Sequence, residues 1–307
     1  MALSIDQLTA ITERYIAPTL HDNIFDSNPL LKKLLNSGQY KGLSGGTVID
    51  APLAYASTTA SGWYEGVETL DTSENDQMTA ARYQWKNAFA GITLSEEDRL
   101  KNGGDAAVLK LLQSKAMLAE KTLKDNLGTG LYSDGTNAKS IVGLRDVVAT
   151  DQNVGQISQA TNSWWQANVD STTTTLTIGA VNAQFDNATV DSEQPDIILS
   201  TRSNYQRYYN LLQPQQRFTD GETAKGGWSN LMFNGKPWIS DSHCPTAHIF
   251  GLNLKALCLW YHKERDFKTM PFQKPDNQEV MISRILWMGA FGSTNNRYHF
   301  KLSAITA

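Results

Sequence analysis

Cysteine is almost absent from this sequence, with only Cys244 and Cys258 among 307 residues. Two cysteines cannot build the disulfide framework that small secreted domains use in place of a large core. The 40% of residues that are hydrophobic are enough to bury a sizeable core without such cross-links. We therefore expect a protein that is made in the cytosol and folds without cross-links.

Long apolar runs are also missing. No segment approaches the roughly 20 apolar residues that a membrane helix needs, so we expect no membrane insertion. The start of the chain, MALSIDQLTAITERY, lacks the basic residues, apolar run and small-residue cleavage site of a signal peptide. These absences exclude membrane proteins and proteins secreted by that route.

Charge is scarce and nearly balanced. Charged residues make up 19% of the chain, and 27 Lys and Arg face 31 Asp and Glu, for a net charge of -4. A free-standing nucleic-acid-binding protein is usually much more basic. The composition therefore argues against a protein whose main activity is to bind DNA or RNA.

One pattern suggests zinc: Cys244 and His248, then Cys258 and His262, form two pairs of equal spacing. The segment around Cys258 is strand-like, which would separate Cys258 from His262 by about 13 Å, too far for one ion. Cys244 precedes a proline in a turn, and the order of ligands differs from that of zinc fingers. We also find no catalytic motif, so we expect no metal site, no catalytic residue and no cofactor.

Two further features leave a weak alternative open. Trp164 and Trp165 could stack a sugar or a base, although anchoring a core or a subunit contact is the commoner use of such rings. Glu96, Glu97 and Asp98 could supply a carboxylate pair, although acids before a helix more often face its positive end. Trp164 and Trp165, with acids near them, keep a carbohydrate-binding or hydrolytic module as an alternative from another functional class.

What the sequence does contain is a long hairpin with a polar, acidic end. Extended runs near residues 48–55 and 82–94 flank about 25 polar residues. In the second run, Tyr83, Trp85 and Phe89 are predicted to share one face of a strand and the charged or polar residues between them the other. A two-stranded hairpin is marginal alone, so it needs a surface to lie on.

The clearest predicted helix covers residues 104–127, with apolar residues at three- and four-residue spacing and Gly128 or Gly130 as its end. Shorter helices are predicted over residues 4–16 and from Pro29 to Gly38. A buried strand at residues 197–199 precedes a helix that we expect to end at Pro214. The remainder reads as five strands, in PWISD, HIFGLN, ALCLWYH, VMISRILWMGAF and YHFKLSAI. The expected class is α+β.

The order of these pieces resembles the major capsid protein of tailed bacteriophages, the Hong Kong 97-like fold that encapsulins share. The matching stretches are PLLKKLLNSGQYKGLSGGTVIDAPLAY, GWYEGVETLDTSENDQMTAARYQWKNAFAGITLSEED, AEKTLKDNLGTGLYSDGT, IVGLRDVV with NSWWQANVD, and DSHCPTAHIFGLNLKAL. The resemblance implies an N-terminal arm, an extended β-hairpin loop, a peripheral domain with a long spine helix, an axial α/β domain and a set of return strands. The corresponding ranges are 1–45, 46–94, 95–135, 136–250 and 251–307.

The resemblance further implies a structural protein without catalysis. Copies of the chain would form hexamers and pentamers of an icosahedral shell around DNA that is not bound sequence-specifically, assembled in the host cytoplasm into the virion capsid. Partners would be other copies, a portal, and separate scaffold and decoration proteins; an encapsulin-like compartment is the closest alternative. The contact with a neighbouring copy would use aromatic and acidic residues of the loop: Trp63, Tyr64, Glu65, Glu68, Asp71, Tyr83 and Trp85.

Overall fold

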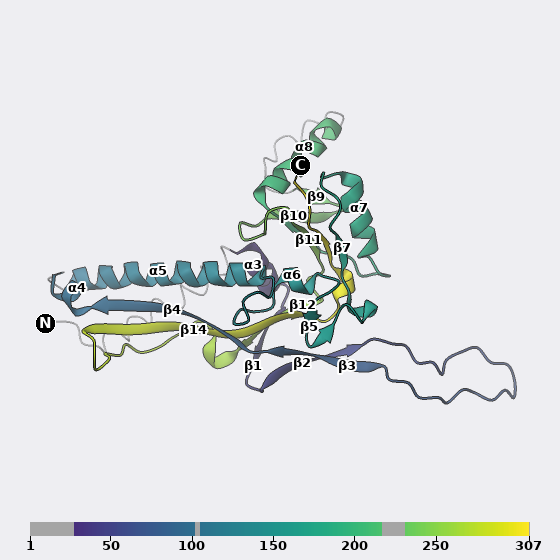
Figure 1. Cartoon of the computed structure of the whole chain (residues 1–307), viewed down its shortest axis with the longest axis horizontal. Helices are drawn as coiled ribbons and strands as arrows, with labels where there is room; N and C mark the ends of the chain where they lie inside the picture. Colours follow the sequence, from purple (N-terminus) through teal and green to yellow (C-terminus); the bar gives the residue numbers. More distant parts are fainter. Residues whose placement is uncertain (1–27, 102–104, 217–230, 307) are drawn as a thin grey trace.

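The computed structural model describes residues 28–101, 105–216 and 231–306. Three parts are visible in Figure 1: a long helix-covered ribbon, a lobe above one end of it, and a loop that projects in the opposite direction. The helix predicted over residues 4–16 lies outside the described residues.

The ribbon, which we call the rod, consists of two long antiparallel strands and a helix. β4 (Lys86–Ser95) and β14 (Val280–Ser293) are paired from Ser95 opposite Val280 to Lys86 opposite Gly289. Beyond β4 come α4 (Glu96–Lys101) and α5 (Asp105–Leu131), and α5 runs back along β4 (Figure 1). The buried residues of α5 keep helical spacing, as the sequence predicts: Leu112, Ala116, Ala119, Leu123 and Leu127.

α5 does not end at a glycine, and that prediction is wrong. The helix continues through Gly128 and Gly130 to Leu131, for 27 residues, or roughly 40 Å at about 1.5 Å per residue. A Cβ atom at Gly128 would lie 2.6 Å from the imidazole of His243, and one at Gly130 would lie 3.2 Å from Ile141. These glycines therefore let other segments pack closely against the helix.

A five-stranded sheet joins the rod to the body of the protein. Its path is β1 (Tyr40–Leu43), β12 (Leu257–His262), β14 and β13 (Lys268–Thr269), with β4 pairing to β14. The predicted helix from Pro29 is α3 (Pro29–Asn36), capped by the Asn28 side chain and followed by Gly38 at φ +70°. Its leucines Leu30, Leu31 and Leu34 are buried, so this segment belongs to the core of its own chain.

The upper lobe holds a six-stranded sheet and two helices. The strand order is β7 (Asn168–Asp170), β15 (Phe300–Leu302), β11 (Ile249–Leu252), β8 (Ile197–Ser200), β10 (Lys236–Ser240) and β9 (Met232–Phe233). The helices are α7 (Ile178–Asn187) and α8 (Arg202–Gln216).

The five strands predicted in the last third of the chain are all present, as β10, β11, β12, β14 and β15. α8 continues two residues beyond Pro214, contrary to the prediction. A proline this close to a helix end removes only one hydrogen bond near a terminus that has unsatisfied groups in any case.

His299 is fully buried between the two sheets and has a polar partner at each ring nitrogen. Its Nδ1 accepts the backbone N–H of Asn253 at 3.1 Å, and its Nε2 lies 3.3 Å from the Ser293 hydroxyl. The neutral ring fits this arrangement, because a proton on Nδ1 would face a donor. Burial lowers the pKa of His299 from 6.5 to about 3.

We expect stability to fall as pH falls from 7 towards 3, since below pH 6.5 only the unfolded chain takes up this proton. The loss due to His299 is about 2 kcal/mol at pH 5. Urea unfolding at pH 7 and pH 5 measures it, with His299→Gln as the comparison, which should show a smaller pH difference. Equal differences in both proteins would contradict this origin.

Candidate functional site

The projecting loop grows out of a two-stranded hairpin. β2 (Val48–Ala54) pairs with β3 (Met78–Gln84), from Val48 opposite Gln84 to Ala54 opposite Met78. The inward residues of the hairpin are buried: Ile49, Ala51, Leu53, Ala81 and Tyr83. Between the strands, the 23 residues Tyr55–Gln77, which we call the distal loop, contain no regular strand or helix and extend away from the body (Figure 1).

Tyr83 does not face a neighbouring copy, and this part of the predicted contact set is wrong. Its side chain is 2% exposed, and its ring lies 5.1 Å from that of Trp260. The hydroxyl donates to the Ser293 carbonyl at 2.7 Å and accepts the Ser293 N–H at 3.1 Å. Burial raises the pKa of Tyr83, so the neutral phenol is the stable form. Tyr83 anchors the hairpin to β14 of its own chain.

Trp85 also lies against its own chain, at a break between β3 and β4. Its indole Nε1 donates to the Gly46 carbonyl at 2.8 Å, and its ring meets the edge of His262. The break shifts the alternation, so that Ala90 and Ile92 point inward and Phe89 is 65% exposed. The prediction of one strand with Tyr83, Trp85 and Phe89 on one face is therefore wrong beyond Trp85. The hairpin ends at Gln84, and β4 belongs to the rod.

The remaining predicted contact residues lie in the distal loop. Trp63 is fully exposed at 104%, and Tyr64 is 64% exposed. The loop carries five acids and no Lys, Arg or His: Glu65, Glu68, Asp71, Glu74 and Asp76. Hydrogen bonds from the Ser73 backbone and hydroxyl lower the pKa of Asp71, so this carboxylate stays charged. The loop therefore presents apolar rings and negative charge together, and its contact with another copy stays a prediction.

The stem of the distal loop is held by a few polar contacts. The Asn75 carboxamide accepts the backbone N–H of Thr59 at 3.2 Å and donates to the Ser57 carbonyl at 3.1 Å. Tyr55 closes the hairpin through its N–H to the Gln77 carbonyl at 3.0 Å. Beyond this stem, the exposed rings have little of their own chain to pack against.

The rod offers a surface of opposite charge that sequence reasoning missed. On the face of the ribbon turned away from α5, exposed Phe89 lies opposite half-buried Leu286. Beside them is a pocket of about 280 Å³ whose charged lining residues are Lys274 and Arg284. The full lining is Met270, Pro271, Gln273, Lys274, Pro275, Ile282, Ser283, Arg284 and Leu286. We call Phe89 and this pocket the outer rod face.

A second pocket, of about 420 Å³, lies between β4, the end of α5 and residues 137–141. Lys86, Lys139 and Phe89 line it, but the Lys86 ammonium already donates to the Ala138 carbonyl. This bond holds the Lys86 ammonium against its own chain, whereas Lys274 and Arg284 are exposed, which makes the outer rod face the better match for an acidic partner.

The other sequence candidates do not assemble into a chemical site. Cys244 and Cys258 are both buried, and burial raises the pKa of each thiol. The Cys258 sulfur donates to Gln39 instead of lying beside His262. Across residues 28–101, 105–216 and 231–306 there is no cluster of three potential metal ligands. Among the helices in these ranges, none is both long and apolar enough to cross a bilayer.

Trp164 and Trp165 do not form an open stacking platform. Trp165 is 1% exposed and donates its Nε1–H to the Val154 carbonyl at 3.1 Å. Trp164 stacks on Tyr55 at the base of the distal loop, with ring centres 5.1 Å apart. The pair is therefore an anchor, the commoner of the two uses that the sequence left open.

Comparison with known proteins gives one clear result. No family model and no curated protein matches the sequence. Among solved structures, the capsid subunit of Cyanophage A-1(L) is similar, with a TM-score of 0.68 at 16% identity over 92% of this chain and 93% of that chain. The chain is also similar to a structure from Mycobacterium phage Bobi, with a TM-score of 0.59 at 13% identity over 89% and 90% of the two chains.

A third neighbour is the SrpI encapsulin of Synechococcus elongatus PCC 7942, with a TM-score of 0.57 at 10% identity over 89% of this chain and 87% of the other. The likeness to the cyanophage subunit is therefore stronger and covers slightly more of both chains. These similarities span nearly the whole length of each partner. The chain has the fold of phage capsid proteins, in the α+β class predicted from its sequence.

Proposed function

We propose that this chain is a major capsid protein, which assembles with copies of itself into the shell of a phage head. The observation that carries this proposal is a capsid-subunit fold over 92% of the chain, combined with a loop that leaves apolar rings uncovered. A free monomer gains nothing from exposing Trp63 and Tyr64 on a long extension, whereas a neighbouring copy can bury them.

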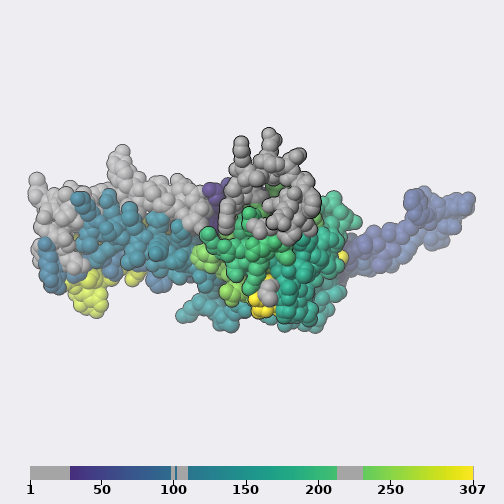
Figure 2. Space-filling model, turned by 90° about the horizontal axis from the view of Figure 1, so that it is seen from above, coloured from purple at the N-terminus to yellow at the C-terminus, as the bar shows by residue number. Residues whose placement is uncertain are grey.

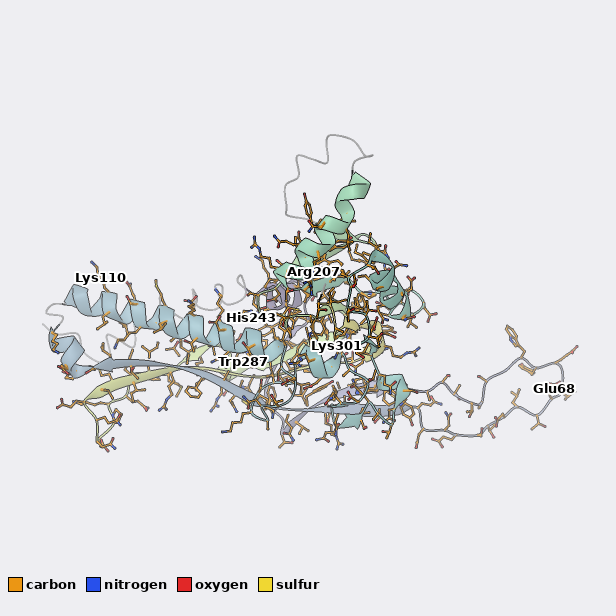
Figure 3. The ribbon with its side chains drawn as sticks, turned by 45° about the horizontal axis from the view of Figure 1, so that its top comes forward. Glu68, Lys110, Arg207, His243, Trp287 and Lys301 are labelled. Carbon is orange, nitrogen blue, oxygen red and sulfur yellow. The ribbon has the colours of Figure 1, made fainter. Side chains whose placement is uncertain are left out.

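The geometry supports a head-to-tail contact between copies. Figure 2 shows the distal loop and the rod leaving the body in opposite directions. In Figure 3, Glu68 and Lys110 mark the two ends. A contact between different surfaces of identical chains closes into a ring when the rotation permits, and rings of this kind build shells.

We propose that the distal loop of one copy lies on the outer rod face of the next. The acids of the loop, with Glu65, Glu68 and Asp71 nearest its rings, meet the pocket that holds Lys274 and Arg284. Trp63 and Tyr64 then cover the exposed Phe89 and the two prolines of the pocket. Opposite charges direct the encounter, and buried ring area supplies most of the affinity.

The remaining assignments belong to the same proposal. Residues 1–45 would be the arm, whose described part, α3 and β1, packs on the core of its own chain. The axial domain would be formed mainly by residues 136–250, with 251–307 returning to both domains. The extended loop would end at Gln84, where its pairing ends. The shell would form in the host cytoplasm, with hexamers and pentamers around DNA, a portal, and separate scaffold and decoration proteins. A net charge of -4 suits a wall that encloses DNA without gripping it.

Light scattering and negative-stain microscopy of the purified protein test the proposal. We expect particles far larger than the 34.0 kDa chain, with closed or tubular walls built from rings. A protein that stays a monomer at high concentration, with and without added scaffold, would contradict it.

The encapsulin neighbour supports a second candidate, a compartment that encloses protein. The contents of particles isolated from their natural source distinguish the two. Nuclease-protected DNA supports the phage head, and a co-purified enzyme supports the compartment.

A further inference from the structure

A segment far from the distal loop in sequence packs against the hairpin that carries it. Residues 153–165, which we call the support segment, contain β5 (Asn153–Val154), β6 (Ile157–Ser158) and the short helix η2 (Ser163–Trp165). The hairpin β2–β3 is a separate two-stranded sheet, and such a ribbon does not hold its own orientation in water. Its orientation therefore depends on what it rests against.

The first contact lies in the middle of the hairpin. Gly155 and Gln156 form the two-residue turn between β5 and β6, with φ of +61° and +63°, as a type I′ turn requires. The Gly155 carbonyl accepts the backbone N–H of Arg82 at 2.9 Å. A Cβ atom at Gly155 would lie 2.6 Å from the Cβ of Ala81, so the turn and β3 touch without space between them.

The second contact lies where the distal loop begins. Trp164 stacks on Tyr55, with ring centres 5.1 Å apart and ring planes 26° apart. Trp165 beneath it is tied to the Val154 carbonyl, and its own carbonyl accepts from the Asn296 side chain at 2.9 Å. Trp164 is therefore carried on a rigid part of the core.

Together with Tyr83, these contacts support the hairpin at three levels. Tyr83 holds its root, Gly155 its middle, and Trp164 the first residue of the distal loop, Tyr55. Ile49 lies opposite Tyr83 at the root of the hairpin, and Tyr55 follows it by six residues. The distance between these two levels is about 20 Å at 3.4 Å per residue. Supports spaced over this length resist tilting of the hairpin in a way that one anchor at the root cannot.

We propose that Gly155 and Trp164 are positioning residues that fix the angle at which the distal loop leaves the body, and thereby the angle between neighbouring copies. This inference rests on the proposed function, because the angle matters only if the loop contacts another copy. Small changes at the support segment then change the curvature of the shell without changing the contact surfaces themselves.

The first test measures loop direction in the full-length chain. Spin labels at Ser61→Cys in the loop and Ser192→Cys in the upper lobe report one distance distribution by electron paramagnetic resonance; both sites are exposed, whereas the native cysteines are buried. We expect a narrow distribution, which Trp164→Ala broadens and Trp164→Phe restores. An unchanged distribution in Trp164→Ala would overturn the inference.

The second test measures the particles. Trp164→Ala is expected to form particles of several diameters where the parent chain forms one, and Trp164→Phe is expected to restore one diameter. Tyr55→Ala removes the other half of the stack and provides an independent variant should Trp164→Ala fold poorly. The matched control is Tyr205→Ala, which removes a half-buried ring from α8 in the upper lobe, away from the hairpin.

The outcomes separate the two proposals. If the unsubstituted chain forms no particles, the proposed function fails. If it forms uniform particles and folded Trp164→Ala and Tyr55→Ala form the same ones, only the positioning role fails. Thermal melting of each variant establishes that it is folded.

Discussion

Replacing Thr58–Glu74 by Asn-Gly is expected to leave the subunit folded and to abolish particle formation. The replacement joins Ser57 to Asn75, which continues the register of the β2–β3 pairs, and Asn-Gly suits a two-residue hairpin turn. No buried residue is removed, because the core side of the hairpin lies in residues 48–54 and 78–84. Trp63, Tyr64 and four of the five acids of the distal loop disappear, and with them the surface that we propose a neighbour covers.

Thermal melting and circular dichroism measure the fold, and light scattering measures assembly. Two matched variants divide the effect: Trp63→Ala with Tyr64→Ala removes rings and keeps charge, whereas Glu65→Gln with Glu68→Gln and Asp71→Asn does the reverse. We expect the ring variant to assemble at least 10-fold less well, since losing two buried aromatic side chains costs more than 1.4 kcal/mol. The charge variant should mainly slow assembly and weaken its salt dependence. Normal particles from the chain with the replaced loop would refute the contact.

Trp287→Ala is expected to destabilise the subunit by about 3–5 kcal/mol, the usual range for removing a buried Trp. Trp287 is 2% exposed on the α5 side of β14, and its indole N–H lies 3.3 Å from the Tyr40 hydroxyl. The loss is a large share of the 5–15 kcal/mol that holds a typical domain together. Urea unfolding of both chains measures it.

Phe89→Ala, on the opposite face of the same ribbon, is the matched control. Phe89 pairs with Leu286, next to Trp287, and is 65% exposed. We expect Phe89→Ala to lower the free energy of unfolding by less than about 1 kcal/mol and to weaken assembly, whereas the main effect of Trp287→Ala is on the free energy of unfolding. Equal destabilisation by both variants would contradict the division into a buried and an outer face.

The sequence predicted elements whose signals are local. The spacing of Leu112, Leu123 and their neighbours marked α5, and Pro29 and Gly38 bounded α3. The exposure of Trp63 and Tyr64 also followed from local polarity, since no continuous apolar segment that could cover them lies near them in the chain. Such features depend on periodicity and turn chemistry, which a single sequence displays.

The errors came from contacts between distant residues. Tyr83 looked available because its partner, Ser293, is 210 residues away. Gly128 looked like a helix end because glycine commonly ends helices. Its actual role is to leave space for the ring of His243, which lies between β10 and β11, far away in the sequence. The outer rod face was missed since it combines Phe89 with residues 270–286. In each case tertiary packing overrode a local rule.

β14 has a mechanical consequence for any wall built from this chain. The strand pairs with β4 over Val280–Gly289 and with β12 over Gly289–Ser293, so one continuous backbone connects the tip of the rod to the centre of the body. Tension along the rod therefore loads its ladder of hydrogen bonds in shear, with the bonds sharing the force instead of opening one after another. A subunit with this arrangement is suited to resist outward pressure from tightly packed contents.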